Sequence, residues 1–282
     1  MDDQEVIVSK TNYAELTETA RRVRINALKA IAAAGSGHPG GSLSAADIIT
    51  ALYFNVMNID PRDPEMEDRD KFVLSKGHAV PALYAALGER GYFDVEDMMT
   101  LRKIDSPFQG HPNMRKVPGI EMSTGSLGQG FSAAVGMATA NKIDGKSGRI
   151  YVLTGDGELQ EGIIWEAAMS AAHRKLDNLV AIVDLNGLQI DGRVDDVMRV
   201  RPVEGKFRRF GWNTLEVDGH SFPELIDAFE SARHTKGVPT AIIANTIKGK
   251  GVSFMEDQAG WHGKAPDQEQ LAQAIQELGG DN

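Results

Sequence analysis

Short apolar runs separated by helical segments are the feature that most constrains the fold of this chain. The runs typical of buried strands are RIYVL (149–153), LVAIVDL (179–185), TLEV (214–217) and TAIIAN (240–245). Helical patterns at 162–175 and 222–234 lie between them. Apolar strands that alternate with helices are typical of a parallel sheet covered on both faces. We therefore predict an α/β fold with a doubly wound, mostly parallel sheet, and treat residues 1–282 as one domain.

The first half of the chain is predicted to be mainly helical. Apolar residues three or four apart indicate an amphipathic helix at Tyr13–Ala34, and Gly35 is placed to end it. Further helices are predicted from a cap at Ser44 through Met57, at Pro81–Leu87 with Gly88 at its end, at Asp94–Arg102 and at Phe131–Lys142, with a strand at Lys71–Ser75.

Charge and composition exclude several classes of protein. The chain has 282 residues, a net charge of −10 and no cysteine, so neither disulfides nor thiolate chemistry is available. An acidic surface repels phosphate backbones, so we expect no nucleic-acid binding. The first ten residues, MDDQEVIVSK, are acidic and do not read as a signal peptide. No run has the ~20 apolar residues of a membrane helix, so we expect a cytoplasmic protein without membrane contact.

Two loops after neighbouring strands carry candidate metal ligands. Asp156 stands between Gly155 and Gly157 directly after one strand, and Asn186 opens NGLQIDG after the next. Parallel strands end at the same edge of a sheet, so these side chains should emerge close together. With a backbone carbonyl of the second loop they offer oxygen ligands only, which favours Mg²⁺. A diphosphate would supply the missing negative charge, and the glycines would let the backbone approach it.

Two other phosphate-binding motifs fit less well. The dinucleotide fingerprint needs a third glycine where GDGELQEG has Gln160, and its second position is the acid Asp156. The P-loop outline occurs in GSGHPGGS (35–42), but Gly41 replaces the lysine that would meet the phosphates. Both alternatives therefore fail on their chemistry.

Histidines in flexible loops are candidates for phosphate contacts or proton transfer. Of the seven in the chain, those flanked by glycine or proline are His38, His78, His111 and His262. We take His173 and His234, late in predicted helices, to be structural. His220 is interpreted as a loop residue that precedes a helix.

The motifs occur in an order that resembles a known family. They are SGHPGGSLSAADIITALYF, DRDKFVLSKGHAVPALYAAL, GHPN, STGSLGQG, GDGELQEG, NGLQIDG and KGKGVSFME followed by WHGKAP. The set is similar to the diphosphate-binding domain of transketolase, a thiamine diphosphate enzyme, from about residue 13 to about residue 266. The resemblance implies thiamine diphosphate with Mg²⁺, or Ca²⁺, as cofactors.

The resemblance also implies roles for individual residues. Those expected at the metal are Asp156, Asn186 and the carbonyl of Leu188. Those expected along the cofactor are Gly125, Ser126, Leu127, Gly155, Gly157, Asn186, His78 and His262. His38 and His111 would face the reacting end of the sugar, with His262 also counted as catalytic. Glu161 would link the two cofactors of an assembly. Ser126 departs from the proline of many members, which argues against assuming the substrate.

Transketolases of full length continue with a pyrimidine-binding domain and a C-terminal domain, which are absent here. The glutamate that activates the cofactor and the basic residues that grip the sugar phosphate belong to those domains, and residues 263–282 contain no candidate for them. The chain therefore resembles the N-terminal subunit of a split transketolase. Its expected partner is a C-terminal, pyrimidine-binding subunit in an α2β2 assembly, although a fragment of a longer chain would look the same.

Three functions remain open at this point. The first is a two-chain transketolase that moves a two-carbon ketol unit between sugar phosphates. The second is another thiamine diphosphate enzyme, such as a specialised sugar transketolase or the α subunit of a 2-oxo acid dehydrogenase. The third is a non-catalytic domain that only binds the cofactor. The loops around His38, His78 and His262 favour transketolase over the dehydrogenase.

Overall fold

Five parallel strands form the central sheet of the structure, a computed structural model that describes residues 11–280. In spatial order they are β1 (Lys71–Leu74), β2 (Ile150–Gly155), β3 (Leu179–Leu185), β7 (Thr240–Asn245) and β6 (Asn213–Asp218). β2, β3 and β7 are buried along nearly their whole length, which is why they consist almost entirely of apolar residues. The expectation about the first ten residues lies outside the described part of the chain.

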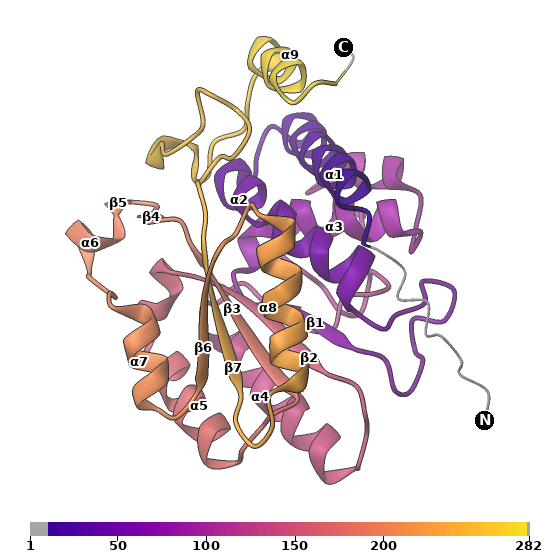
Figure 1. The fold of residues 1–282 in the computed structure, drawn as a ribbon. Helices are drawn as coiled ribbons and strands as arrows, with labels where there is room; N and C mark the ends of the chain where they lie inside the picture. The colour runs from indigo at the N-terminus through magenta and orange to yellow at the C-terminus, as the bar shows by residue number, and fades with distance from the viewer. Residues whose placement is uncertain (1–10, 281–282) are drawn as a thin grey trace.

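Helices cover both faces of this sheet (Figure 1). One face packs on α1 (Tyr13–Ala34), α2 (Pro39–Ala51), α3 (Val80–Arg90) and α8 (Phe222–His234), and the other on α4 (Gln129–Ile143), α5 (Gly162–His173) and α7 (Val203–Arg209). Side chains of β2 alternate between the two cores: Tyr151 and Leu153 join the first, Ile150 and Val152 the second. The predicted doubly wound α/β fold is therefore confirmed.

The remaining elements are short, apart from the last helix. They are α6 (Val194–Val197), α9 (Gln268–Glu277), the antiparallel pair β4 (Leu188–Gln189) and β5 (Gly192–Arg193), a π-helical turn at Leu52–Val56, and 3₁₀ turns at Gly77–Ala79, Val95–Thr100, Gly157–Gln160 and Ala259–Trp261. α9 lies beside α1 (Figure 1), where a small third core includes Leu28, Trp261 and Ala274. This packing holds the segment between β7 and α9 against the body of the domain.

Several helix boundaries differ from the sequence prediction. α1 is confirmed, since Gly35 adopts φ 61° and its N–H bonds the carbonyl of Ala32. α2 begins at Pro39 rather than after Ser44, because proline suits the first turn of a helix. Gly88 does not end α3, which runs on to Gly91 at φ 97°. The helix predicted at 94–102 is only the 3₁₀ turn at 95–100.

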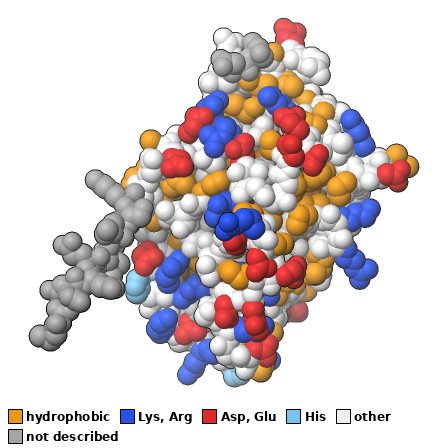
Figure 2. All heavy atoms as spheres, turned by 90° about the vertical axis from the view of Figure 1, so that its right-hand side faces the viewer, with side chains coloured by type: hydrophobic (Ala, Val, Ile, Leu, Met, Phe, Trp, Pro, Cys, Tyr) orange, Lys and Arg blue, Asp and Glu red, His pale blue; other side chains and the backbone are white. Residues whose placement is uncertain are grey.

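The surface carries charges of both signs. Figure 2 shows acidic and basic side chains interspersed over the described residues of one face. None of the helices among residues 11–280 combines the length and the apolar character needed to cross a membrane.

Candidate active site

A cavity of about 310 Å³ lies at the carboxyl edge of β2 and β3. Its lining residues are His38, Gly41, Lys76, His78, His111, Gly125, Leu127, Gly155, Asp156, Gly157, Glu158, Gln160, Glu161, Asn186, Leu188, Gln189, Ile190, Lys248 and His262. Every residue that the sequence assigned to a site lines it except Ser126, which is exposed and whose carbonyl accepts the N–H of Gln129 as α4 begins. Loops far apart in the sequence therefore converge on one pocket.

Asp156 connects the two loops that were expected to meet. Its Oδ1 accepts the N–H of Gly157 at 2.8 Å, and its Oδ2 accepts the N–H of Gly187, in the loop after β3, at 2.6 Å. Burial, and then the charge of Asp184, raise the pKa of Asp156 to about 6. A cation beside Asp156 would stabilise its ionised carboxylate and offset the cost of burying that charge, so the electrostatics suit a metal ion.

The other expected metal ligands lie in the same loop. Asn186 Oδ1 accepts the N–H of Leu188 at 3.1 Å, which tightens the turn. The carbonyl of Leu188 accepts a hydrogen bond of 2.8 Å from Lys248 Nζ. Among the residues that the structure describes, no group of three or more His, Cys, Asp or Glu side chains is arranged so that it could hold a metal ion by itself. Any metal here would therefore be held by one carboxylate and neutral oxygens, with a ligand supplying further oxygens.

The histidines from four loops form one cluster. His38 is the N-cap of α2, His78 lies in the turn before α3, and His262 follows the turn at 259–261. The ring of His38 lies 5.2 Å from that of His78, 5.5 Å from that of His262 and 6.3 Å from that of His111, between centroids. The rings of His78 and His262 are 5.0 Å apart. Such spacing places all of them around a single ligand.

Burial keeps this cluster uncharged. Loss of solvent is the largest cause that lowers the pKa of His38 to about 4 and of His262 to about 3, and nearby cations add to it. The pKa of His78 and of His111 is lowered for the same first reason. Neutral imidazoles can accept a proton on one nitrogen and donate from the other, as acid–base chemistry requires.

Two buried lysines, for which the sequence predicted no role, also line the cavity. Lys248 Nζ lies 2.9 Å from His262 Nδ1, and burial lowers the pKa of this lysine to about 8. Lys76 Nζ donates to the carbonyl of Gly41 at 2.9 Å and pairs with Asp184. Both lysines stand within motifs quoted for the resemblance, SKGHA and KGKG. A lysine next to glycine in a loop was the sequence signal that could have identified them.

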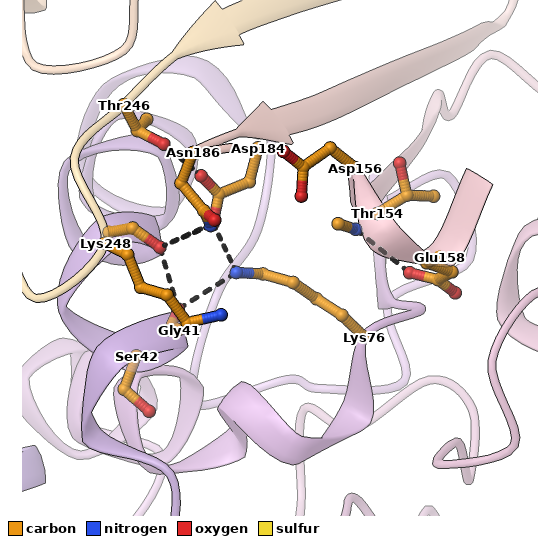
Figure 3. A network of polar contacts seen from close by, with 12 residues as sticks. Gly41, Ser42, Lys76, Thr154, Asp156, Glu158, Asp184, Asn186, Thr246 and Lys248 are labelled. Atoms are coloured by element: carbon orange, nitrogen blue, oxygen red, sulfur yellow. Dashed lines mark hydrogen bonds and ion pairs between the residues drawn. The ribbon is translucent and has the colours of Figure 1, made fainter. Parts of the chain in front are cut away.

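Asp184, near the end of β3, is a buried carboxylate that binds side chains from several segments around the cavity. It is fully buried and accepts hydrogen bonds from Ser44 at 2.6 Å, from Lys76 and from Thr246. The Lys76 cation and these hydroxyls lower the pKa of Asp184 in spite of its burial, which acts in the opposite direction. Figure 3 shows Lys76 reaching from its turn toward Asp184 and Gly41. The network fixes where the Lys76 ammonium group sits.

Glu158 holds three of the loops together. Its Oε1 accepts the hydroxyl of Ser75 at 2.5 Å and the N–H of Gly128 at 2.8 Å, while its Oε2 accepts the N–H of Gly155 at 3.0 Å. Burial raises the pKa of Glu158, and these three donors oppose that rise. The side chain therefore positions the SKGH, SLGQG and GDG segments relative to one another.

The pocket has the properties of a site for an anionic ligand. His38 Nδ1 is buried and has no hydrogen-bond partner, an arrangement that usually marks a missing ligand or water. Gly41 leaves room beside the histidines, since a Cβ there would lie 3.3 Å from His78 Nε2. Lys76 and Lys248 line the same cavity as His38. The donor set fits a diphosphate.

The other histidines lie outside this cavity. His220, interpreted as a loop residue before a helix, precedes α8 as expected. Its Nδ1 lies 2.7 Å from Asp47, which also pairs with Arg24, and its Nε2 accepts the N–H of Ile247. His173 and His234 end α5 and α8, as the sequence predicted.

A doubly wound sheet with an anion-binding pocket at the carboxyl ends of its strands defines a cofactor-binding α/β domain. Residues 16–282 match the family described as transketolase, thiamine diphosphate binding domain. The chain belongs to the transketolase family, and it corresponds to the N-terminal, thiamine diphosphate-binding domain of that family.

Two relatives have nearly the same extent as this chain. It is 47% identical over 264 residues to the 6-deoxy-6-sulfo-D-fructose transketolase subunit SqwG of Clostridium sp. (strain MSTE9), a match that covers 94% of this chain and 96% of the relative. It is 44% identical over 264 residues to one subunit of the apulose-4-phosphate transketolase of Phocaeicola vulgatus, covering 94% and 93%.

Other relatives are much longer. Human transketolase is 46% identical over 264 residues, which cover 93% of this chain and 42% of the human protein. The solved structure of transketolase from Campylobacter jejuni superposes with a TM-score of 0.91 at 35% identity, covering 96% of this chain and 44% of that one. The chain thus spans less than half the length of these transketolases.

Proposed function

We propose that this chain is the N-terminal subunit of a two-chain transketolase. Together with a pyrimidine-binding subunit it would transfer a two-carbon ketol unit from a ketose to an aldose. The observation that carries the proposal is the convergence of His38, His78, His111 and His262 on the pocket that also contains Asp156. The match covers 96% and 93% of the two relatives that are named as subunits, which supports a transketolase divided between two chains.

Cofactor binding is assigned to the strand-end loops. Asp156, Asn186 and the carbonyl of Leu188 would hold Mg²⁺, for which Ca²⁺ is an alternative. His78, His262 and the backbone at Gly155 and Gly157 would hold the diphosphate. Lys248 donates a hydrogen bond to the Leu188 carbonyl. This carbonyl oxygen would therefore bind the metal through its second lone pair, or after the lysine side chain has turned toward the diphosphate. Bound thiamine diphosphate supplies the nucleophilic carbon of the reaction.

Proton handling is assigned to the neutral histidines. His38 and His111 would hold and move protons at the carbonyl and first hydroxyl of the sugar, while His262 contributes from the diphosphate side. Their lowered pKa values keep them unprotonated at neutral pH, so they are ready to accept a proton. Glu161 is exposed at the rim of the cavity, where it can link two active sites through contact with a partner chain.

The substrates are proposed to be sugars that carry a strong anion. The names of two relatives specify a sulfonated fructose and a phosphorylated apulose, which share an anionic group. The family assignment removes the 2-oxo acid dehydrogenase alternative, whereas a specialised sugar transketolase stays within the proposal. The buried His38 nitrogen without a partner and the low pKa of the histidines favour catalysis over a domain that only binds the cofactor.

The experiment is a reconstitution. The purified chain is supplied with Mg²⁺, thiamine diphosphate, a ketose phosphate and an aldose phosphate, with and without a pyrimidine-binding partner subunit, which is first sought in the neighbouring reading frames. We expect ketol transfer only when both chains are present. Transfer by this chain alone would overturn the two-chain proposal. Cofactor binding without transfer by any combination of chains and sugars would overturn the transketolase assignment.

A further inference from the structure

The segment 246–249, which follows β7, carries Lys248 into the cavity of the candidate active site. Lys248 Nζ reaches the carbonyl of Leu188 and the ring of His262. Its stem packs against Gly40 of α2, where an added Cβ would come within 3.1 Å of Lys248 Cγ and 3.2 Å of its Cε. Because this lysine is only 3% exposed, the position of its ammonium group depends on how the backbone of 246–249 is held.

Three backbone N–H groups attach this segment to neighbouring elements. Thr246 donates to the last carbonyl of β3 at 3.3 Å, and Gly249 donates to a carbonyl of α2 at 3.0 Å. Between them, the N–H of Ile247 donates to His220 Nε2 at 2.9 Å. The first two bonds join backbone to backbone, whereas the third depends on one side chain, from the loop before α8. His220 is therefore the side chain that holds the N–H directly before Lys248.

The two partners of His220 decide which of its ring nitrogens carries the proton. Nε2 accepts the N–H of Ile247, so it has no hydrogen of its own. Nδ1 lies 2.7 Å from Asp47 Oδ2, so it carries the hydrogen and donates it to the carboxylate. A ring protonated on both nitrogens would turn an N–H toward the N–H of Ile247, and the bond would be lost. The contact with segment 246–249 therefore requires the neutral ring.

Asp47 is itself fixed by Arg24. Arg24 Nη1 donates to Oδ1 at 2.9 Å and Nη2 to Oδ2 at 2.5 Å, and both side chains are 8% exposed. Burial acts to raise the pKa of Asp47, but the charge of Arg24 and the hydrogen bond from His220 outweigh it, so that the pKa is lowered. A continuous chain of contacts thus runs from Arg24 in α1 through Asp47 in α2 and His220 to Ile247. None of these four residues lines the active-site cavity.

We propose that His220 is a positioning residue for cofactor binding, which holds Lys248 in the cavity through the N–H of Ile247. The inference rests on the proposed function and deepens it, because it assigns a task to a histidine that lines no part of the cavity. The task needs a donor toward Asp47 and an acceptor toward Ile247 within one rigid group, which the neutral imidazole supplies. Without this bond the backbone at Ile247 can shift, and with it the ammonium group of Lys248 beside the diphosphate site.

Two substitutions separate the acceptor of His220 from its donor. In His220→Gln the side-chain oxygen can reach the position of Nε2 and accept the N–H of Ile247. In His220→Asn the shorter amide reaches only the position of Nδ1, where it can donate to Asp47. We expect His220→Asn to raise the Kd of thiamine diphosphate by roughly 5- to 100-fold, because the bond that fixes Lys248 is lost and an N–H is left unpaired. His220→Gln should stay within about threefold of the unchanged chain, because the acceptor is kept.

Calorimetry with Mg²⁺ and thiamine diphosphate, in the presence of the partner chain, measures these dissociation constants. His234→Asn is the matched control, because His234 is 74% exposed at the end of α8. The control should bind the cofactor as the unchanged chain does. Equal dissociation constants for His220→Asn and His220→Gln, or the larger one for His220→Gln, overturn the proposal.

A double-mutant cycle tests whether His220 acts through Lys248. Lys248→Met removes the ammonium group and keeps a stem of similar length. In the Lys248→Met chain, the further change His220→Asn should alter the Kd by less than about twofold, because the group that it positions is gone. The same factor in both backgrounds would show that His220 acts on the cofactor by another route, and would overturn the proposal.

A measurement on the unsubstituted chain distinguishes this inference from the proposed function. In the full chain labelled with ¹⁵N, without cofactor or partner, the N–H···N bond should give a scalar coupling between the Ile247 amide and His220 Nε2, and Nδ1 should carry the hydrogen. This coupling, with the expected order of dissociation constants but no ketol transfer, would leave the inference standing while the proposed function fails. An uncoupled or doubly protonated ring at neutral pH overturns the inference, whatever the enzyme does.

Discussion

At the scale of single residues, two opposing effects act on the ionisation of Asp156. Its position at the end of β2 buries the carboxylate almost completely, and burial raises its pKa to about 6. Two backbone N–H groups are aimed at its oxygens, which favours the ionised form. The residue is thus poised to gain from a cation, because the backbone alone does not offset the cost of burying its charge.

Asp156→Ala should abolish the Mg²⁺-dependent binding of thiamine diphosphate while the fold survives. The alanine leaves only neutral oxygens for the metal, and the loop lies at the edge of the sheet. Calorimetry with Mg²⁺ and thiamine diphosphate, in the presence of the partner chain, measures the affinity, and circular dichroism checks the fold. Unchanged affinity in the variant would show that the metal is held elsewhere.

The same residue should make the stability of the metal-free chain depend on pH. A folded-state pKa of about 6 against an ordinary value of 3.8 means that the folded chain holds a proton which the unfolded chain has lost. The free energy of unfolding should therefore fall, relative to that of Asp156→Ala, by up to roughly 3 kcal/mol as the pH rises from about 4 to above 6. Urea unfolding of both proteins across this range measures the difference, and parallel curves would contradict the pKa.

The four clustered histidines should divide into two groups by their effect. His78→Ala and His262→Ala should weaken cofactor binding, each by roughly 1.5–3 kcal/mol, because a hydrogen bond to a charged diphosphate is lost. His38→Ala and His111→Ala should lower turnover by ~10²–10⁴-fold, as expected for a lost general acid or base. Steady-state kinetics at saturating cofactor separate the groups. Rescue of all four variants by excess cofactor would contradict the roles of His38 and His111.

At the scale of secondary-structure elements, residues at the ends of the strands contribute more to the site than residues in the middle of the strands. Asp184, the next-to-last residue of β3, binds side chains from α2, from the turn after β1 and from the segment after β7. Elements that contribute to separate cores thereby meet at one buried carboxylate. These contacts fix the residues at the base of the pocket.

Lys76→Met should therefore lower the free energy of unfolding by about 3–5 kcal/mol, since it leaves Asp184 buried without its cation. Arg193→Gln is the matched control, because the pair of Arg193 with Asp257 is 59% and 53% exposed. That substitution should cost less than about 1 kcal/mol. Denaturant unfolding measures both, and equal small losses would show that Asp184 does not depend on Lys76.

The helices and strands could be predicted from the sequence as far as local pattern determines them. α1 and α8 have the predicted bounds because their apolar spacing is regular and glycine or a changed pattern follows. The start of α2 could not be predicted from Ser44, since the hydroxyl of that residue serves Asp184, 140 positions away. α9 was not predicted, although Asp267 and Gln270 form a capping box.

At the scale of the whole molecule, parallel strand order brings the site together at one edge. The sequence could predict that the loops of Asp156 and Asn186 meet, because consecutive strands β2 and β3 are neighbours. It could not predict that Lys76, Lys248 and Glu158 join them, since their contacts depend on the order of strands distant in sequence. The glycine and proline flanks of the loops identified the four histidines, and the motif resemblance gave their roles, whereas only the fold shows the ion pairs beside them.

The mouth of the pocket should also be the surface that the partner subunit covers. Ile190, which lines the cavity, is 63% exposed, and Met198, whose carbonyl is bonded by Gln160 of the same lining, is 61% exposed. Met198→Glu should therefore weaken association with the partner by at least about tenfold, since it places a charge in an apolar interface.

Ile143→Glu is the control for that prediction, because Ile143 is 78% exposed and ends α4, shortly before β2 begins at the opposite edge of the sheet. Analytical ultracentrifugation of each variant with the partner measures the dissociation constant. Equal affinities for the two variants would place the interface away from the pocket mouth.

Glu158 limits how this pocket can be redesigned. Because one buried carboxylate serves Ser75, Gly128 and Gly155 together, a loop grafted from another enzyme changes three segments at once. A donor loop that lacks the matching hydroxyl or N–H would leave a buried oxygen without its hydrogen bond, far from the residue that was exchanged. Engineers who wish to alter the sugar preference should transplant these segments as a unit, or vary only side chains that Glu158 does not hold.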